Sequence, residues 1–300
     1  MCGINGFNFK DELLVTKMNE VTKHRGPDSS GIFLDEEVSF GHNRLSIIDV
    51  SDRASQPMYS DDENLVIIFN GEIYNFKELK KELKDYLFKT DSDTEVILAS
   101  YKKWGKDCVK KFNGIFAFAI WDKKTKELFV VRDQMGIKPL YYFWDGKKFI
   151  FSSEIKAILE HKVPRILNKE AFNHYLRVLY VPEPHTMFKG IYKLPPASFG
   201  VLKEGELNIT KYWELTEGKK LDFSKKEIIK QLKQKILNSV ERQLISDRPL
   251  GIYLSGGIDS SVVLHNVSKL RSKIDTFSIG FDLTEAEESE KFNADFNLAK

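Results

Sequence analysis

The sequence predicts an α+β domain followed by the beginning of an α/β domain, and three observations support this prediction. The chain has 300 residues, which exceeds the usual size of a single core and favours two domains. Short segments rich in aromatic and branched residues fill the first half and are typical of antiparallel strands. Near the C-terminal end, an apolar segment, a glycine-rich stretch and a periodic apolar segment follow one another, which indicates a parallel strand–loop–helix unit.

The strand-like segments of the first half share a high content of aromatic and branched residues. They are Cys2–Phe7, Gly41–Ile48, Leu65–Phe69, Gly114–Trp121, Glu127–Arg132, Leu140–Phe143 and Phe149–Ser152. Two helices are expected between them, because apolar residues recur there at helical spacing. The first stripe is Phe76, Leu79, Leu83, Tyr86 and Leu87, and the second is Val96, Ile97, Ser100, Tyr101 and Trp104. Both stripes are interpreted as faces that pack on a sheet.

The linker between the domains is expected in a polar, charged stretch around the isolated pair Tyr212-Trp213. The predicted limits are 2–206 for the first domain, 207–222 for the linker and 223–300 for the second domain. After the linker, apolar residues repeat every four positions at Ile228, Leu232, Ile236, Val240 and Leu244, which predicts a helix. The pattern then predicts a strand at Pro249–Leu254, a loop at Ser255–Ser261, a helix at Ile258–Leu270 and a strand at Ile274–Phe281.

Only about one parallel unit precedes Lys300, and such a unit needs further strands and covering helices to bury its faces. The last stretch, Glu285–Lys300, is expected to be a charged loop that enters a new helix without a terminating signal. The sequence is therefore expected to be a truncated part of a longer protein.

Composition and charge exclude several classes of protein. Hydrophobic residues make up 42% and charged residues 30% of the chain, which favours a soluble globular protein over a disordered or fibrous one. The net charge of +2 and the mixing of lysine with glutamate do not indicate a nucleic-acid partner. Because neither a bilayer-spanning apolar run nor a secretion signal is found, we expect no membrane association and a cytoplasmic location.

Cysteine and histidine are spaced in a way that predicts no metal site. Two cysteines are too few for a disulfide framework, and six scattered histidines lack ligand spacing. Cys108 lies beside Val109 and Phe112 and is interpreted as a small buried apolar residue without a catalytic role.

Cys2 follows the initiator methionine, and removal of Met1 would expose a thiol and a free α-amino group on one residue. A thiol with a pKa of ~8.5 is only a few per cent thiolate at neutral pH, whereas an α-amine with a pKa of ~7.7–8.0 can take its proton. Nucleophile and base would then share one residue. A Met-Cys start also occurs by chance, so this feature alone leaves a non-catalytic cysteine as the alternative.

Six motifs accompany Cys2, and together they resemble class II glutamine amidotransferases, which are N-terminal-nucleophile hydrolases. The motifs are Met1–Phe7, His24–Asp28, Gly41–Asp49, Asn70–Asn75, Asp91–Glu95 and Arg132–Tyr141. They appear in the order of that family across the first two thirds of the chain. The resemblance implies an αββα sandwich with Cys2 as its nucleophile.

Attack of a thiolate on the glutamine side-chain amide creates an oxyanion, and a donor that stabilises it is often worth ~3–4 kcal/mol. Asn70 and Gly71 offer a side-chain NH₂ and a backbone N–H, and the resemblance gives them this role. An isolated Asn-Gly pair is also typical of a hairpin turn, which is the alternative.

Free glutamine is recognised through a guanidinium for its α-carboxylate and carboxylates for its α-ammonium. The resemblance assigns the first role to Arg44, beside the backbone of Leu45, Ser46, Ile47 and Ile48, and the second to Glu72 and Asp93. It also places Arg25 and Gly26 in a mobile loop over the site, without a firm role. Taken singly, each charged residue also fits a solvated surface position.

The stretch Ser255–Ser261 lies between a predicted strand and a predicted helix, where backbone N–H groups can bind phosphate. It lacks the lysine of a Walker A loop and is similar to the Ser-Gly-Gly-x-Asp-Ser loop of ATP pyrophosphatases. The resemblance implies that ATP binds at Leu254, Ser255, Gly256, Gly257, Asp259, Ser260 and Ile279, with Mg²⁺ near Asp259. A merely structural serine–glycine turn is the alternative.

A glutaminase followed by an ATP pyrophosphatase resembles the glutamine-hydrolysing asparagine synthetases. The resemblance implies that glutamine is hydrolysed to glutamate and ammonia, and that ammonia amidates an aspartyl-AMP intermediate formed from ATP and aspartate. The fold it implies is the αββα sandwich followed by a truncated, doubly wound parallel-sheet domain. The alternatives are a related ATP-dependent amidotransferase acting on another carboxylate or a sugar, and a non-enzymatic protein that keeps the fold. Whether the protein forms a homodimer is left open.

Overall fold

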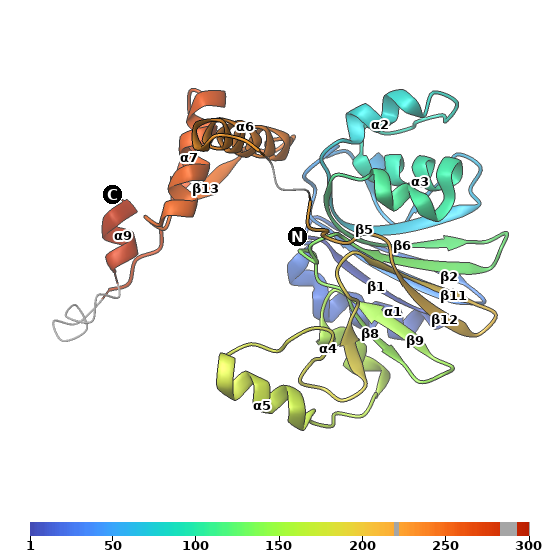
Figure 1. The fold of residues 1–300 in the computed structure, drawn as a ribbon. Coiled ribbons are helices and arrows are strands. Elements are labelled where there is room, and N and C mark those ends of the chain that lie inside the picture. Colours follow the sequence, from blue (N-terminus) through green and yellow to red (C-terminus); the bar gives the residue numbers. More distant parts are fainter. Residues whose placement is uncertain (219–221, 283–292, 300) are drawn as a thin grey trace. The chain divides into compact units, whose positions relative to one another are not determined.

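The computed structural model describes residues 1–218, 222–282 and 293–299. Its contacts divide the chain into two units, Met1–Thr216 and Glu217–Lys300. The first unit contains two six-stranded sheets, and every strand pair in them is antiparallel (Figure 1). The second unit contains a parallel strand pair. Antiparallel sheets followed by a parallel strand–loop–helix unit are therefore confirmed.

The first sheet has the strand order β10-β8-β9-β1-β3-β2. Its strands are β1 (Gly3–Phe7), β2 (Ser29–Asp35), β3 (Val38–Arg44), β8 (Tyr141–Trp144), β9 (Phe149–Ser152) and β10 (Ile191–Lys193). Strand β1 lies between β3 and β9, with Gly3 opposite Asn43 and Asn5 opposite Ser152. The N-terminus of the chain therefore starts from the middle of this sheet, and Cys2 directly precedes β1.

The second sheet has the strand order β12-β11-β7-β6-β5-β4. Its strands are β4 (Met58–Tyr59), β5 (Leu65–Ile73), β6 (Gly114–Asp122), β7 (Glu127–Arg132), β11 (Ser198–Lys203) and β12 (Glu206–Lys211). Strand β12 occupies the first part of the stretch 207–222 that the sequence predicts to be a linker. Its residues pair with β11 although most of them are polar and exposed, because an edge strand needs only one hydrogen-bonded neighbour.

The two sheets pack face to face, and helices cover both outer faces (Figure 1). Side chains alternate across each strand, so Ile4 and Phe40 of the first sheet meet Ile68 and Ala119 of the second. On the outer faces lie helices α1 (Glu12–Thr22) and α4 (Ile155–Ile158) on one side, and α2 (Phe76–Glu82) and α3 (Asp93–Trp104) on the other. The expected sandwich of two sheets covered by helices is confirmed.

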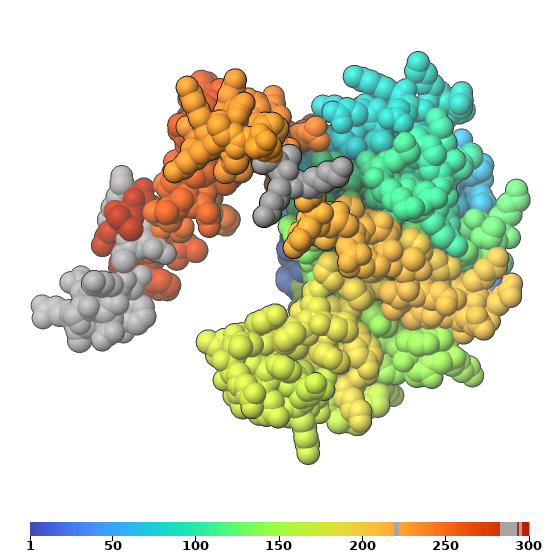
Figure 2. Space-filling model, viewed as in Figure 1, coloured from blue at the N-terminus to red at the C-terminus, as the bar shows by residue number. Residues whose placement is uncertain are grey.

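Helix α5 (Lys169–Val178) belongs to a projecting part of the first unit, drawn in yellow in Figure 2. Large apolar side chains on and after it are exposed, among them Leu176 and Leu179. Ala171 is the one buried residue of this helix.

Three local expectations differ from the structure. Helix α2 ends at Glu82, and Leu87 of the predicted stripe is 76% exposed. The strand predicted at Gly41–Ile48 ends at Arg44. Helix α1 has no counterpart among the predicted elements, because it buries the polar Asn19 and Thr22 on its inner face, which weakens the apolar periodicity.

The second unit contains α6 (Lys225–Gln243), β13 (Gly251–Tyr253), α7 (Ile258–Leu270), β14 (Asp275–Phe277) and α9 (Ala294–Ala299). Ser224 and Glu227 form a capping box that starts α6. Strands β13 and β14 pair over three residues, so both are shorter than predicted. Residues 285–292 of the expected charged loop lie outside the described residues. Within the described part of the chain, no helix is both long and apolar enough to cross a bilayer.

Candidate active site

The sheet register brings three predicted site residues to one end of the sandwich. Arg44 is on the same face of β3 as Val38 and Phe40, which fill the space between the sheets. By the same alternation Asn70 shares a face of β5 with Ile68, and Cys2 shares one with Ile4. These side chains therefore converge where the interlayer core opens.

A pocket occupies this end, with a volume of about 220 Å³. That is below the roughly 300–1,000 Å³ typical of sites for drug-sized ligands, so it suits a molecule the size of an amino acid. Its lining includes the predicted residues Cys2, Arg44, Leu45, Ile47, Ile48, Asn70, Gly71, Glu72 and Asp93, and also Met1, Ala54, Gln56, Phe69, Ser92, Thr94 and Lys138.

The Cys2 sulfur lies at the end of β3. Its Sγ accepts a hydrogen bond from the Leu45 N–H at 3.3 Å and lies 3.6 Å from the Leu45 carbonyl oxygen. Burial raises the pKa of the Cys2 thiol, while the Leu45 N–H and the positive charges of the terminal amine, Lys138 and Arg44 act in the opposite direction. Burial also lowers the pKa of the terminal amine, here on Met1.

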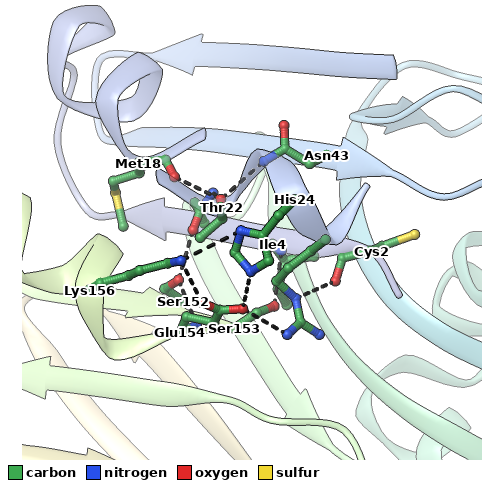
Figure 3. A network of polar contacts seen from close by, with 12 residues as sticks. Cys2, Ile4, Met18, Thr22, His24, Asn43, Ser152, Ser153, Glu154 and Lys156 are labelled. Carbon is green, nitrogen blue, oxygen red and sulfur yellow. Dashed lines mark hydrogen bonds and ion pairs between the residues drawn. The ribbon is translucent and has the colours of Figure 1, made fainter. Parts of the chain in front are cut away.

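Arg25 fixes the main chain of the nucleophile and contacts Glu154, which Figure 3 shows beside His24 and Lys156. It lies in a short turn (Lys23–Arg25), and its Nε donates to the Cys2 carbonyl oxygen at 2.9 Å. Its guanidinium pairs with Glu154, which also contacts His24 and Lys156. Burial would raise the pKa of Glu154, but the hydrogen bonds from Arg25, Lys156 and His24 outweigh it and lower that pKa. The resemblance assigned Arg25 no firm role, and the structure shows that it contacts the backbone of Cys2.

Asn70 presents a buried carboxamide without a protein partner. It is 1% exposed, and neither Oδ1 nor Nδ2 has a hydrogen-bond partner within the described residues. The preceding residue is held from both sides, because Phe69 N donates to Gln56 Oε1 and the Phe69 carbonyl lies 3.0 Å from His42 Nε2. Burial lowers the pKa of His42 to about 4, so this ring is neutral at pH 7. The strand is fixed while the Asn70 amide stays available.

Gly71 follows on the opposite face of β5. A Cβ at this position would lie 2.2 Å from the Ile115 carbonyl oxygen on β6, so close packing of the two strands requires glycine here. The structure therefore explains this glycine by the packing of two strands. The reason expected from the sequence was close approach of a substrate to the main chain.

Arg44 and the residues after it form one wall of the pocket. The Arg44 guanidinium donates to the carbonyl oxygens of Asp49 and Ser51, and the side chain is 5% exposed. The chain leaves the strand after Arg44 because Ser46 N donates to Asp28 Oδ2 at 2.8 Å and Asp49 adopts a positive φ. Ser46, predicted to be at the site, is turned toward Asp28 and does not line the pocket, whereas its neighbours do.

Two carboxylates form the opposite wall. Asp93 begins α3, is 4% exposed, and accepts a hydrogen bond from Ile73 N at 2.9 Å. The pKa of Asp93 is raised to about 7, chiefly by burial and also by nearby Glu72, although the hydrogen bond from Ile73 N acts in the opposite direction. Burial also raises the pKa of Glu72. A cation bound between them would favour the ionised form of both acids.

The residues predicted to bind ATP lie in the second unit. Gly256 has a φ of 74°, and the loop closes through Ser255 Oγ and Ser260 Oγ, which are 3.2 Å apart. Gly257 is the N-cap of α7 and provides no side-chain cap, so the first-turn N–H groups are left for another acceptor. This arrangement fits a phosphate group.

Two further members of the ATP set, Leu254 and Ile279, flank this loop. Leu254 N donates to the Phe277 carbonyl oxygen, and the Leu254 carbonyl oxygen accepts from Ser278 Oγ, which precedes the exposed Ile279. Asp259 is exposed in the first turn of α7. No cluster of three or more His, Cys, Asp or Glu side chains suited to a metal occurs among the described residues.

Comparison with protein families gives two matches. The family described as "Glutamine amidotransferase domain" matches residues 1–213, and the family described as "Asparagine synthase" matches residues 231–299. The chain belongs to the glutamine amidotransferase family. The second match makes it an amidotransferase related to asparagine synthetases, and the first domain implies glutamine as a substrate.

Individual relatives of this amidotransferase agree. The chain is 42% identical to a putative glutamine-hydrolysing asparagine synthetase 2 of Methanocaldococcus jannaschii, over 94% of this chain and 60% of that protein. It is 40% identical to a glutamine-hydrolysing asparagine synthetase 1 of Bacillus subtilis, over 94% of this chain and 46% of that protein. The chain thus spans about half the length of these relatives.

A solved structure shows the same fold at low sequence identity. It is the glutamine phosphoribosylpyrophosphate amidotransferase of Bacillus subtilis, with a TM-score of 0.55 and 16% identity, covering 97% of this chain and 70% of that one. The first unit therefore has an amidotransferase fold. Of the doubly wound domain expected after it, the described residues contain one parallel strand pair, so that part stays a prediction.

The amidotransferase pocket also contains residues that the sequence argument left without a role. Lys138 lies within the quoted motif Arg132–Tyr141, so the motif was a signal for it, although no function followed. Gln56 belongs to no quoted motif, and a glutamine in a polar loop carries no pattern that would single it out. Cys108 is fully buried, in agreement with its interpretation as a small apolar residue.

Proposed function

We propose that this chain hydrolyses glutamine to glutamate and ammonia, with Cys2 as the nucleophile. The observation that carries the proposal is the buried, unpartnered carboxamide of Asn70 in the same pocket as the Cys2 sulfur. Attack of the thiolate on the glutamine side chain places negative charge on the former carbonyl oxygen. Asn70 Nδ2 and the Gly71 N–H are the proposed donors to that oxygen, and a donor without a protein partner needs no rearrangement to act.

The base is proposed to be the α-amine of Cys2 after removal of Met1. This amine takes the thiol proton and delivers it to the departing ammonia, and water then releases glutamate from the thioester. The bond from Arg25 to the Cys2 carbonyl supports this role, because it orients the residue that supplies both groups.

Recognition of free glutamine is proposed to use the two walls of the pocket. Arg44, beside the backbone of Leu45 and Ile47–Ile48, binds the α-carboxylate, and Glu72 and Asp93 bind the α-ammonium. The raised pKa of Asp93 supports this assignment, because a bound ammonium would stabilise the ionised carboxylate.

We further propose that residues 223–300 begin an ATP-binding domain and that the whole protein is an asparagine synthetase. The support is the match to the asparagine synthase family and the uncapped start of α7. Leu254–Gly257, Asp259, Ser260 and Ile279 would hold ATP, and Mg²⁺ near Asp259 would neutralise phosphate charge. Ammonia from the first site would then amidate aspartate activated as its adenylate.

The test replaces each cysteine in turn. We expect Cys2→Ala to abolish glutamate release from glutamine while Cys108→Ala, at a buried position outside the pocket, keeps it. In the full-length protein, externally supplied ammonia should still support formation of AMP and asparagine from ATP and aspartate in the Cys2→Ala variant. Glutamate release by Cys2→Ala at the wild-type rate would contradict the nucleophile. Amidation of another carboxylate or a sugar in place of aspartate would show that aspartate is not the acceptor.

A further inference from the structure

The loop between β7 and β8 fixes Lys138 through charged side chains. Arg132 donates to the Lys138 carbonyl oxygen at 2.9 Å and to the Gly136 carbonyl oxygen at 2.6 Å. Asp133 accepts hydrogen bonds from Lys138 N and Ile137 N, both at 2.9 Å. Arg132 and Asp133 are themselves buried. Charge-assisted bonds of this kind are strong and directional, so the position of Lys138 is closely determined.

The Lys138 side chain lines the glutaminase pocket without an ion-pair partner. It is 6% exposed, and its Nζ contacts the Met1 sulfur at 3.3 Å. Within the described residues, no carboxylate lies within ion-pair distance of this Nζ. A thioether is a weak acceptor, and a buried ammonium without a partner costs stability. Stability of the fold therefore does not explain a lysine at this position.

The charged groups that face Lys138 and Cys2 come from several elements. They are Arg25 from the Lys23–Arg25 turn, Arg44 from β3, Glu72 from β5, Asp133 from the loop of Lys138, and the terminal amine, which Met1 carries here and Cys2 would carry after its removal. Burial lowers the pKa of Lys138, whereas Glu72 and Cys2 raise it and Arg25 lowers it. Lys138 and Cys2 line the same pocket, so the charge of each acts on the other across it.

We propose that the Lys138 ammonium acts through Cys2 as a positioning charge, which favours the thiolate and disfavours protonation of the terminal amine beside it. The inference rests on the proposed glutaminase function. One cation affects both groups in the same direction, because it attracts the thiolate and repels an ammonium. Lys138 neither gives nor takes the proton, which moves from thiol to amine within Cys2. The effect is to make nucleophile and base available at neutral pH.

The experiment compares Lys138→Met, Lys138→Arg and Lys147→Met. Methionine keeps the length and the packing of lysine but removes the charge. Lys147 lies exposed in the β8–β9 turn, so its replacement removes a charge far from any described contact with the pocket. Two curves are recorded from about pH 6 to about pH 10, the range in which thiols and α-amines titrate. They are the rate of Cys2 alkylation by iodoacetamide, located by mass spectrometry, and kcat/KM for glutamine hydrolysis.

We expect Lys138→Met to move the midpoints of both curves upward by about one pH unit, which lowers kcat/KM about tenfold near pH 7. Lys138→Arg and Lys147→Met should keep the wild-type midpoints. The melting temperature of Lys138→Met should equal or exceed that of the wild type, because an uncompensated buried charge is removed.

Two other outcomes are distinguishable from this one. An alkylation midpoint that is unchanged in Lys138→Met, with or without a lower melting temperature, would overturn the proposed charge effect, and the lysine would then be structural. A wild-type protein that hydrolyses no glutamine at any pH would instead remove the proposed function, while the alkylation curves would still show whether Lys138 acts on Cys2.

Discussion

The two units use similar residues in their strands, but they differ in how far they bury them. Phe116 and Phe118 on β6 are fully buried, whereas Tyr253 on β13 is 78% exposed and Phe277 on β14 is 55% exposed. Strand β6 has a neighbour on each side and a layer on each face, while β13 and β14 pair over three residues. The comparison shows that a strand is buried only where neighbouring strands and helices cover it. An apolar composition alone does not bury it.

The candidate sites differ in the same way. Asn70 on β5 and Asp93 at the start of α3 are nearly inaccessible, whereas Ser255 and Asp259 are exposed in and just after the loop that precedes α7. Burial alters the pKa values of acids and can leave an amide without a hydrogen-bond partner. Both effects help a site to bind charged substrates and to stabilise charge that develops during a reaction. The first site is therefore organised by residues that the structure describes, and the second offers mainly backbone N–H groups.

The largest expected difference between the units is in stability. Phe118→Ala removes a fully buried ring and should lower the free energy of unfolding of the first unit by about 3–5 kcal/mol. Val263→Ala on α7, where the side chain is 40% exposed, should cost less than about 1 kcal/mol. All four tryptophans lie in the first unit, so urea unfolding followed by tryptophan fluorescence reports that unit. If Val263→Ala shifted that transition as much as Phe118→Ala, the units would be energetically coupled and the comparison would fail.

The sequence predicted elements best where a local pattern matches the final environment. Strands β7 and β9 and helix α7 have the predicted bounds, because short apolar runs mark the two strands and apolar residues at helical spacing mark α7. Strand β12 was missed, because most of its residues are polar and exposed and its pairing with β11 uses the main chain. Main-chain hydrogen bonds form with almost any residue type, so the sequence does not indicate them.

The site residues also differ in how far the sequence predicted them. The motif resemblance indicated Cys2, Arg44, Asn70 and Asp93, and the structure brings all of them to one pocket. Gln56, in a loop, and His42, on the other sheet, contribute by holding the backbone of Phe69, and this depends on the distance between separate segments of the chain. No local pattern contains that distance, so such supporting residues are visible only in the folded chain.

The next effect in size tests the unpartnered amide of the first site. Asn70→Ala should lower kcat for glutamine hydrolysis by a factor of about 10²–10³ with little change in KM, because the lost donor acts mainly in the transition state. Asn208→Ala, on the exposed edge strand β12, is the matched control and should keep wild-type kinetics. A fall in kcat below about twofold for Asn70→Ala would exclude this amide from the oxyanion site.

The smallest effect tests the first site through pH, because this site contains a carboxyl, that of Asp93, whose pKa is raised to about 7. Binding of glutamine is measured by calorimetry with Cys2→Ala, which separates recognition from the titration of the nucleophile. As the pH falls through about 7, Asp93 gains a proton and loses the charge that would pair with the α-ammonium. Affinity should therefore weaken by up to tenfold per pH unit below pH 7.

Combining Cys2→Ala with Asp93→Asn identifies the titrating group. The amide cannot ionise, so affinity should be low at every pH and the dependence near pH 7 should disappear. Glu72 also has a raised pKa, and any weaker dependence that persists at lower pH in the double variant would belong to it. Constant affinity of Cys2→Ala between about pH 8 and about pH 5.5 would mean that Asp93 keeps its charge and that the bond from Ile73 N outweighs its burial.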